Sequence, residues 1–343
     1  MAIDRTSEKT VWISWEWHRR SAELCKALNV DFLHRDYAGP RLIRYAVLTV
    51  WTVLTLIRRR PTLVFCQNPS IVLAAVLCAI KQPLGFGLVM DRHSNFKLST
   101  KTSRSAKWRL FHRLSRFVNR AADLTIVTNQ KLADIVAIEG GRPQILHDRI
   151  PQLAQPSEFA LPNRFVIAFV CTFSWDEPVE EVLAAAALLP PDYCVYITGR
   201  PKVARLSDEA LARAGERVSL TGFLDEPSYS SLLRASDAVM VLTTNEDTLL
   251  CGTYEAVSVG KPMITSDTEA LKSFLPIGCV HTPACATAIA AAIQHAIAIK
   301  LKLEGEVELL RENMDRLWEA RFSELLRTVS TIRASHPRSA SDS

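Results

Sequence analysis

Short apolar runs, each followed by a helix-like segment, recur along the whole chain, and this alternation is the feature that most limits how the chain can fold. Strand-like runs occupy residues 11–15, 62–66, 86–90 and 124–128 in the first half, and residues 165–171, 193–198, 218–221, 238–242 and 263–266 in the second half. Alternating strands and helices form parallel sheets with helices on both faces. The sequence therefore predicts an α/β fold.

The length of the chain indicates two domains. Its 343 residues, 48% of them hydrophobic, exceed what one core usually holds. Three prolines fall within residues 151–163, which favours a linker there. We predict a first domain at 1–150, this linker, and a second domain at 164–305. A helix at 306–333 is expected to cross back to the first domain, and a disordered tail to follow at 334–343.

Cysteine usage and apolar runs indicate a cytoplasmic location. The eight cysteines are scattered without C-x-x-C pairs, which favours free thiols in a reducing compartment. The longest apolar run, residues 45–57, would rise only about 20 Å as a helix, less than the roughly 30 Å core of a bilayer. The first ten residues carry acids and no apolar stretch, so no signal peptide is expected.

Residues 245–262 hold the densest group of candidate binding residues. They follow the strand-like run at 238–242 and contain a short helix opened by Gly252 and Thr253. A helix start offers unpaired N–H groups and a positive dipole end, which suit a diphosphate. Glu255, one turn into the helix, is placed to accept hydrogen bonds from two vicinal hydroxyls. An ordinary helix capped by Thr253 explains the same spacing.

This segment resembles the donor-sugar loop of the GT-B retaining glycosyltransferases, family 4 in particular. That family has the pattern E-x7-E followed by A-x-x-x-G-x-P. This chain has Asp247, seven intervening residues, Glu255 and then AVSVGKP. The resemblance implies that Glu255 holds the ribose of a nucleotide sugar and that Asp247, one methylene shorter than the family's Glu, lies by the donor sugar as a catalytic residue.

Five further segments resemble the chitobiosyldiphosphodolichol β-mannosyltransferases of family 33. In chain order they read QNPS at 67–70, DRHS at 91–94, DRIP at 148–151, TFSWDE at 172–177 and TGRP at 198–201. Two of these loops are shorter here than in the family, which has S-T-S-W-x-x-D-E and T-G-K-G-P at the last two places. The resemblance implies GDP-mannose as the donor, with a UDP-sugar as the next choice.

Both resemblances imply a GT-B fold, in which two Rossmann-like domains have parallel sheets facing a central cleft and the second domain binds the nucleotide sugar. Arg200 and the N–H groups at the helix start would hold the diphosphate, since the Arg and Lys that family 4 carries after the first strand of this domain are missing. Gly222 and Phe223 would contact the base. The donor-binding residues implied in this way are Glu255, Arg200, Gly252, Thr253, Gly222, Phe223, Thr172 and Ser174.

Polar residues also follow two strand-like runs of the first domain, where an open parallel sheet binds its ligands. Asp91 and His93 follow the run at 86–90, and we expect one of them to help deprotonate the hydroxyl of the acceptor. His18, Arg19 and Arg20 follow the first run and are expected to bind an acceptor phosphate, although a solvated helix start explains them as well. No D-x-D motif is present, so no metal is implied, and a helix N-terminus and an arginine can stabilise the leaving diphosphate.

A basic amphipathic helix is predicted at residues 103–122. Residues 92–122 contain nine Lys or Arg and no acid. Together with the apolar run at 45–57, which has arginines at both ends, this helix predicts peripheral attachment to the anionic inner face of the plasma membrane. The alternative is that both helices pack on the sheet with their charges in water. No RNA-binding motif is present, so nucleic acid is not expected as a partner. The apolar face of the predicted helix comprises Trp108, Phe111, Leu114, Val118 and Ala121.

These features predict a nucleotide-sugar-dependent glycosyltransferase that moves a hexose onto a lipid-linked or polysaccharide acceptor in surface glycan synthesis. One alternative is a UDP-sugar-dependent family 4 transferase. Another is a non-catalytic GT-B-like subunit that only binds a partner enzyme or a polysaccharide. A sugar-nucleotide epimerase fits less well, because its pattern needs acids in the first domain that are not found.

Overall fold

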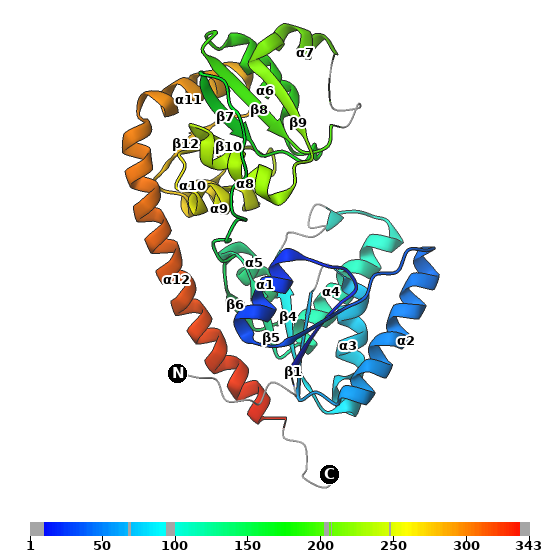
Figure 1. Cartoon of the computed structure of the whole chain (residues 1–343). Helices are drawn as coiled ribbons and strands as arrows, with labels where there is room; N and C mark the ends of the chain where they lie inside the picture. Colours follow the sequence, from blue (N-terminus) through cyan, green and yellow to red (C-terminus); the bar gives the residue numbers. More distant parts are fainter. Residues whose placement is uncertain are drawn as a thin grey trace. The chain divides into compact units, whose positions relative to one another are not determined.

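The computed structural model describes residues 10–67, 70–93, 100–201, 206, 208–246 and 248–336. The chain forms two compact units, of which unit 1 is coloured blue to cyan with the red end of α12, and unit 2 green to orange, in Figure 1. Unit 1 comprises Met1–Asp148 and Trp318–Ser343, and unit 2 comprises Arg149–Leu317. Each unit is built on one six-stranded sheet in which every paired strand is parallel, as the alternation of strands and helices predicted.

Unit 1 alternates strands and helices from its first described residue. In chain order its elements are β1 (Thr10–Ser14), α1 (Arg19–Leu28), β2 (Asp31–His34), α2 (Arg41–Arg59), β3 (Leu63–Gln67), α3 (Ile71–Leu84), β4 (Gly87–Arg92), α4 (Ala106–Ala121), β5 (Leu124–Val127), α5 (Gln130–Ile138) and β6 (Pro143–Ile145). The strand order is β2-β1-β3-β4-β5-β6, so the order reverses between β1 and β3. The last part of α12 (Lys300–Ala334), from Trp318 onward, belongs to the same unit.

Helices cover both faces of this sheet, which explains why its central strands are apolar without a polar face. Successive side chains of a strand point to opposite faces. Val11 and Ile13 therefore pack into the cluster made with α2, α3 and α4, whereas Trp12, between them, packs into the cluster made with α1 and α12. In the second cluster Leu24 of α1 and Trp318 of α12 are both buried.

Unit 2 has the strand order of a dinucleotide-binding sheet. In chain order its elements are β7 (Phe165–Phe169), α6 (Val179–Leu188), β8 (Tyr193–Thr198), α7 (Asp208–Ala214), a 3₁₀ turn η4 (Gly215–Arg217), β9 (Val218–Gly222), α8 (Glu226–Ala235), β10 (Ala238–Val241), α9 (Cys251–Ser258), β11 (Met263–Ser266), α10 (Glu269–Phe274), β12 (Cys279–Thr282), α11 (Ala286–Ala298) and the start of α12. The order β12-β11-β10-β7-β8-β9 reverses between β7 and β10. Sheets of this kind bind ligands beyond the carboxyl ends of the strands at such a reversal.

The core of unit 2 also lies on both faces of its sheet. Helices α6, α7 and α11 form one cluster with the alternate residues Ile167 and Phe169 of β7. Helices α8, α9, α10 and the first part of α12 form the other with Ala168, which lies between them. The buried residues Val307 and Leu310 of α12 belong to the second cluster. Helix α9, which contains the predicted donor-binding residues Gly252, Thr253 and Glu255, lies on this second face.

Several elements differ from those predicted. The short strands β2 and β12 and the helix α10 were not predicted, and α12 runs from Lys300 to Ala334 instead of 306–333. Most of the tail expected at 334–343 lies outside the described residues. Ser70 is the N-cap of α3, as its position suggested, but its hydroxyl makes no capping hydrogen bond. All eight cysteines are free thiols.

Among the described residues, no single helix has the length and apolar character needed to cross a membrane. One bent pair, α11 with α12, passes that test by length and composition alone. Helix α11 packs into the core of unit 2 through Ile289 and Ile293, both fully buried.

Candidate active site

The loops after β7 and β10 contact each other at the point where the strand order of unit 2 reverses. The hydroxyl of Thr243 donates to Oδ2 of Asp176 at 2.7 Å, and the N–H of Thr244 donates to the carbonyl of Asp176 at 2.7 Å. The hydroxyl of Ser174 donates to Oδ1 of Asp176 at 2.6 Å. Asp176 thus ties the loop after β7 to the loop after β10.

Glu177 holds the loop after β7 around its own carboxylate. The N–H groups of Thr172 and Ser174 donate to Oε2 at 3.0 and 2.6 Å, and the hydroxyl of Thr172 donates to Oε1 at 3.2 Å. Phe173, between them, has a positive φ of 57°. N–H groups that converge around such a residue form an anion-binding hollow. Thr172 and Ser174, predicted to bind the donor, therefore bind the carboxylate of Glu177 in this structure.

The ends of β8 and β9 bring three predicted donor residues together. The N–H of Gly199 donates to the carbonyl of Gly222 at 3.0 Å. Gly199 has φ +91°, and a Cβ there would lie 2.2 Å from the carbonyl oxygen of Cys171, so only glycine fits this turn. The next residue, Arg200, places its guanidinium 5.2 Å from the ring centroid of Phe223, a cation–π distance. Phe223 is 72% exposed, so a cation and an aromatic face are presented together at the sheet edge.

Helix α9 begins close to the carboxyl ends of β7 and β10 because Gly252 has no side chain. A Cβ on Gly252 would lie 3.0 Å from methyl groups of Val170 and Val241. Thr253 is fully buried, and both its N–H and its hydroxyl donate to the carbonyl of Leu250, at 3.0 and 2.6 Å. The structure therefore corrects the role predicted for Thr253, because its N–H closes the helix start and is not presented to a diphosphate.

Glu255 lies one turn into α9, as predicted, and is 9% exposed. The hydroxyl of Tyr229, in α8, donates to Oε2 of Glu255 at 2.5 Å. This is the distance expected when a hydroxyl donates to an ionised carboxylate. The neighbours of Glu255 on the helix, Ala256 and Val257, are fully buried in the apolar cluster that α8 shares. The carboxylate is thus held at the border between the core and the carboxyl edge of the sheet.

In unit 1 a single buried arginine joins three segments. Arg20, in the first turn of α1, donates from Nε to the two carboxylate oxygens of Asp91 at 3.0 and 3.1 Å. Its Nη2 donates to the carbonyl of Leu146 at 2.9 Å, and its Nη1 donates to Asp148. Arg20 is only 7% exposed. The structure contradicts the prediction that Arg20 binds an acceptor phosphate, because its buried guanidinium donates to two carboxylates and a carbonyl of the protein itself.

Asp91, at the end of β4, has a side chain with no exposed surface. Burial alone would raise its pKa, but the positive charge of Arg20 and the hydrogen bond from His93 lower the pKa of Asp91 to about 2. A carboxylate so buried and so acidic does not meet an acceptor hydroxyl or take up its proton at neutral pH. The structure therefore corrects the catalytic contact predicted for Asp91, which instead supports His93.

His93 is the member of this cluster that reaches the surface, with a side chain that is 13% exposed. Its Nδ1 lies 3.0 Å from Oδ2 of Asp91. Because the carboxylate accepts, the neutral imidazole carries its proton on Nδ1 and has Nε2 as a proton acceptor, which is the arrangement of a carboxylate-oriented general base. The ring of His18 stacks on that of His93 with centroids 4.5 Å apart. Burial and the neighbouring His93 lower the pKa of His18.

The other predicted residues are less informative. Arg19 is exposed at the start of α1, next to the buried Arg20. Asp247, predicted as a catalytic residue by the donor sugar, lies outside the described residues. Within the part of the chain that the structure describes, no group of three or more His, Cys, Asp or Glu is arranged to hold a metal ion.

Sequence reasoning missed residues that hold the candidate residues in place. Tyr229 was not singled out, because it is separated by 26 positions from its partner Glu255. The contact of Arg20 with Asp91 spans 71 positions. Glu177 was recognised only as part of a resembling segment, although an acid six residues after the end of an apolar strand run is a signal for a carboxylate that closes the loop back on itself.

Comparisons with known proteins identify a family match within unit 2 and solved structures with a similar fold. Residues 164–298 match the model of the family described as glycosyl transferases group 1. A search of curated protein sequences gave no match. The chain superimposes on a sucrose-phosphate synthase from Thermosynechococcus elongatus with a TM-score of 0.73 and 17% identity, covering 95% of this chain and 99% of that one.

Two further solved structures have similar folds. Anabaena HepE, in complex with UDP, gives a TM-score of 0.70 at 16% identity and covers 94% of this chain and 100% of that one. The pneumococcal O-GlcNAc transferase GtfA, in complex with UDP and GlcNAc, gives 0.62 at 15% identity over 82% of this chain and 59% of that one. At such identities the likeness establishes the fold, and it confirms the predicted GT-B architecture.

The residues of the matched domain include Arg200, Phe223 and Glu255, which the sheet brings to the carboxyl ends of β8 and β9 and to the start of α9. The prediction of an enzyme of the glycosyltransferase class is confirmed by this match. The protein is therefore a glycosyltransferase of GT-B architecture that carries a glycosyl transferases group 1 domain at residues 164–298.

Proposed function

We propose that this enzyme transfers a hexose from a nucleoside diphosphate sugar to a hydroxyl of a lipid-linked or saccharide acceptor. The observation that carries the proposal is the group 1 domain, whose residues 164–298 contain every described candidate donor residue. Within it, Arg200 offers a positive charge to a diphosphate, Phe223 offers an exposed aromatic face to a base, and Glu255 offers a carboxylate to ribose hydroxyls.

Two donor classes are supported by different observations. The resemblance of the five short segments to family 33 favours GDP-mannose. The structural neighbours favour a UDP-sugar, because HepE was solved with UDP-glucose and GtfA with UDP and GlcNAc. We expect a hexose in either case, and the nucleotide is decided by the first experiment below.

In the reaction that we propose, the acceptor oxygen forms a bond to C1 of the sugar while the bond from C1 to the diphosphate oxygen breaks. The acceptor proton passes to Nε2 of His93, whose other ring nitrogen is held by Asp91. The nucleoside diphosphate leaves with its negative charge balanced by Arg200 and by the positive dipole end of α9. Asp247 remains the residue that we expect beside the donor sugar.

The test begins with a thermal-shift screen of UDP, GDP and their hexose derivatives, since a ligand at 100 times its Kd stabilises by about 2.7 kcal/mol. The donor selected is then used in a transfer assay with radiolabelled sugar. Glu255→Gln should weaken donor binding by about tenfold or more, because a charge-assisted hydrogen bond becomes a neutral one. The matched control is Glu269→Gln, an exposed position in α10 of the same unit. Stabilisation by nucleotide without any transfer or hydrolysis would favour the alternative of a non-catalytic subunit.

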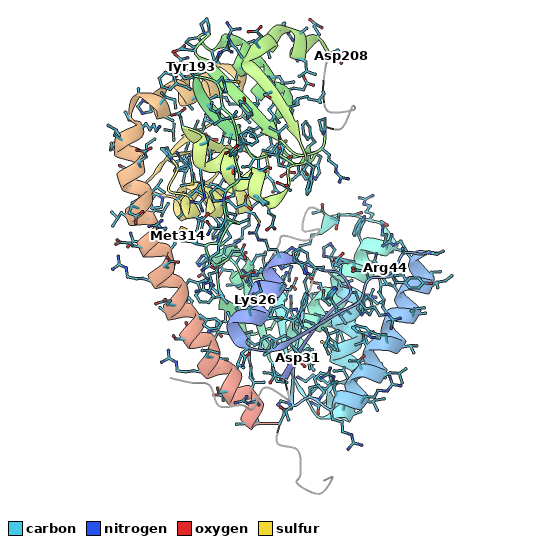
Figure 2. The ribbon with its side chains drawn as sticks, viewed as in Figure 1. Lys26, Asp31, Arg44, Tyr193, Asp208 and Met314 are labelled. Atoms are coloured by element: carbon cyan, nitrogen blue, oxygen red, sulfur yellow. The ribbon has the colours of Figure 1, made fainter. Side chains whose placement is uncertain are left out.

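We also propose that unit 1 attaches to an anionic membrane surface, which would give access to a lipid-linked acceptor. Helix α2 exposes Ile43, Val50, Leu54 and Ile57 at helical spacing. A groove of about 600 Å³ is lined by Val50 and Leu54 and by Arg35 and Arg58. Arginines also lie at both ends of α2, including Arg44, labelled in Figure 2.

Helix α4 adds exposed basic residues and the exposed apolar side chains Leu110 and Phe117, while Val118 is the residue of its apolar face that is fully buried. The packing of α2 and α4 on α3 supports the use of both helices on one surface of unit 1. The alternative, in which their charges only face water, predicts no response to lipid composition.

Liposome flotation separates these alternatives. Each Lys or Arg near an anionic surface contributes about 1 kcal/mol, so charge reversal of three arginines should weaken binding more than about 100-fold. We expect the parent protein to float with vesicles rich in anionic lipid at low salt, and the triple reversal at Arg109, Arg113 and Arg116 to remain in solution. A matched reversal at the exposed Arg213, Lys302 and Arg316 should leave flotation intact. If the parent protein stays at the bottom of the gradient at low salt, a saccharide acceptor in solution becomes the better proposal.

A further inference from the structure

The carboxylate of Glu255 sits where an unsupported negative charge would be unfavourable. The residue is 9% exposed, and the next two helix residues, Ala256 and Val257, are fully buried in an apolar cluster. A buried carboxylate needs hydrogen-bond donors to stay ionised. The hydroxyl of Tyr229 supplies one at 2.5 Å from Oε2.

Tyr229 is itself fixed by the start of α8. Asp225 caps this helix, accepting from the N–H of Ser228 at 2.9 Å with its side chain and from the N–H of Tyr229 at 2.9 Å with its carbonyl. The ring of Tyr229 packs against the same apolar cluster as Leu224. A capped helix turn therefore holds the side chain of Tyr229. Tyr229 lies six positions after Phe223, the exposed residue that we assign to the base.

We propose that Tyr229 is a positioning residue that sets the orientation of the Glu255 carboxylate for the ribose of the donor, and that it thereby determines the preference of the site for ribonucleotides over 2′-deoxyribonucleotides. This inference rests on the proposed function, because it takes Glu255 as the ribose-binding residue. The terminal torsion of a glutamate is broad and nearly two-fold, so the carboxylate plane is not fixed by the helix. One short hydrogen bond to Oε2 fixes that plane, and a carboxylate still has further lone pairs for two ribose hydroxyls.

A purely structural role for Tyr229 makes a different prediction. Loosening α8 would weaken the binding of every nucleotide by the same factor. Loss of carboxylate orientation weakens only the contact to the ribose hydroxyls, so the ribonucleotide loses affinity while its 2′-deoxy analogue loses less. The ratio of the two affinities is therefore the informative quantity.

The experiment measures Kd by calorimetry for UDP with 2′-deoxy-UDP and for GDP with 2′-deoxy-GDP. In the parent protein we expect the ribonucleotide that binds to be preferred by about tenfold or more, as one charge-assisted hydrogen bond requires. In Tyr229→Phe this preference should fall by about three- to tenfold. Tyr193→Phe, at the start of β8 in Figure 2, is the matched control and should keep both the affinity and the ratio.

A second measurement tests whether Tyr229 acts through Glu255. In the Glu255→Gln background, adding Tyr229→Phe should change the ratio by less than about twofold, since the oriented carboxylate is already gone. A larger additional change would overturn the inference, as would a Tyr229→Phe protein that melts like the parent and keeps the parent ratio. If the parent binds a nucleotide but does not distinguish the 2′-deoxy form, the ribose role of Glu255 fails and this inference fails with it. Absence of any nucleotide binding would overturn the proposed function as well.

Discussion

The buried pair of Arg20 and Asp91 makes a quantitative prediction for the substitution Asp91→Asn. In the folded protein burial would raise the pKa of Asp91, but Arg20 and His93 lower it to about 2 from an ordinary value of 3.8. Each unit of such a shift corresponds to 1.36 kcal/mol, so the ionised carboxylate should stabilise the folded state by about 2 kcal/mol relative to a neutral group. Asparagine has nearly the same shape as the neutral acid and should lose that amount at pH 7.

The pH dependence follows from the direction of the shift. Because the pKa of Asp91 is lower in the folded state than in the unfolded state, its stabilisation is fully present above about pH 5. It is lost as the pH falls through 3.8 towards 2, when the folded protein must also take up the proton. The difference between the parent and Asp91→Asn should therefore be constant from pH 7 to pH 5 and should shrink below pH 4.

Urea unfolding followed by tryptophan fluorescence reports mainly on the unit that contains this pair. Trp175 lies in unit 2, and the remaining tryptophans lie in unit 1. The control is Asp36→Asn, at an exposed position of unit 1, which should cost less than about 0.5 kcal/mol. The argument is refuted if Asp91→Asn unfolds within about 0.5 kcal/mol of the parent at pH 7, or if their difference is the same at pH 3 as at pH 7. The tryptophans of unit 1 are Trp12, Trp15, Trp17, Trp51, Trp108 and Trp318.

Two further predictions concern the two units separately. His93→Ala should lower turnover by about 10²–10⁴-fold, because a general base on the acceptor side acts in the chemical step. Donor affinity, measured by calorimetry, should stay within about twofold. Unchanged turnover would mean that another residue is the base, and Glu16 and His18 would be tested next. Gly199→Ala should destabilise unit 2 by more than about 2 kcal/mol, since its Cβ would lie 2.2 Å from a carbonyl oxygen at φ +91°. The control Gly215→Ala, also at positive φ but with open space around the Cβ, should cost only about 1 kcal/mol in thermal or urea unfolding, and equal losses for the two variants would contradict the steric argument.

The parts of the fold that the sequence predicted are those whose burial is uniform along the strand. Strand β10 is apolar and buried from Ala238 to Val241 because helices cover both faces of its sheet, and such a run stands out without any knowledge of its neighbours. Strand β2 was missed because its four residues lie at the sheet edge, where Asp31 and His34 are exposed and leave no apolar run. The start of α12 was missed for a related reason. Leu303, before the predicted start at residue 306, packs in the core of unit 2, so a tertiary contact extends the helix beyond its strongest amphipathic part.

Residues of the candidate site were predictable only where the relevant partners are close in sequence. His93 could be paired with Asp91 because only one residue separates them at one strand end, and the structure has that contact. Arg19 and Arg20 could not be told apart in the same way. Neighbouring residues on a helix point about 100° apart, so only one of the two can face the sheet that α1 covers.

Arg20, and not Arg19, is the buried arginine because the buried carboxylate of Asp91 requires a cation in contact with it. Asp91 lies one residue before the end of the central strand β4, and its side chain has no exposed surface. An ionised group there requires a cation in contact, and the first turn of α1 is where the chain brings one, 71 positions away in sequence. An acid at the end of a central parallel strand thus indicates that one arginine or lysine of a neighbouring helix has a structural role. In this protein that residue is Arg20, so the exposed Arg19 is the better candidate for binding an acceptor phosphate.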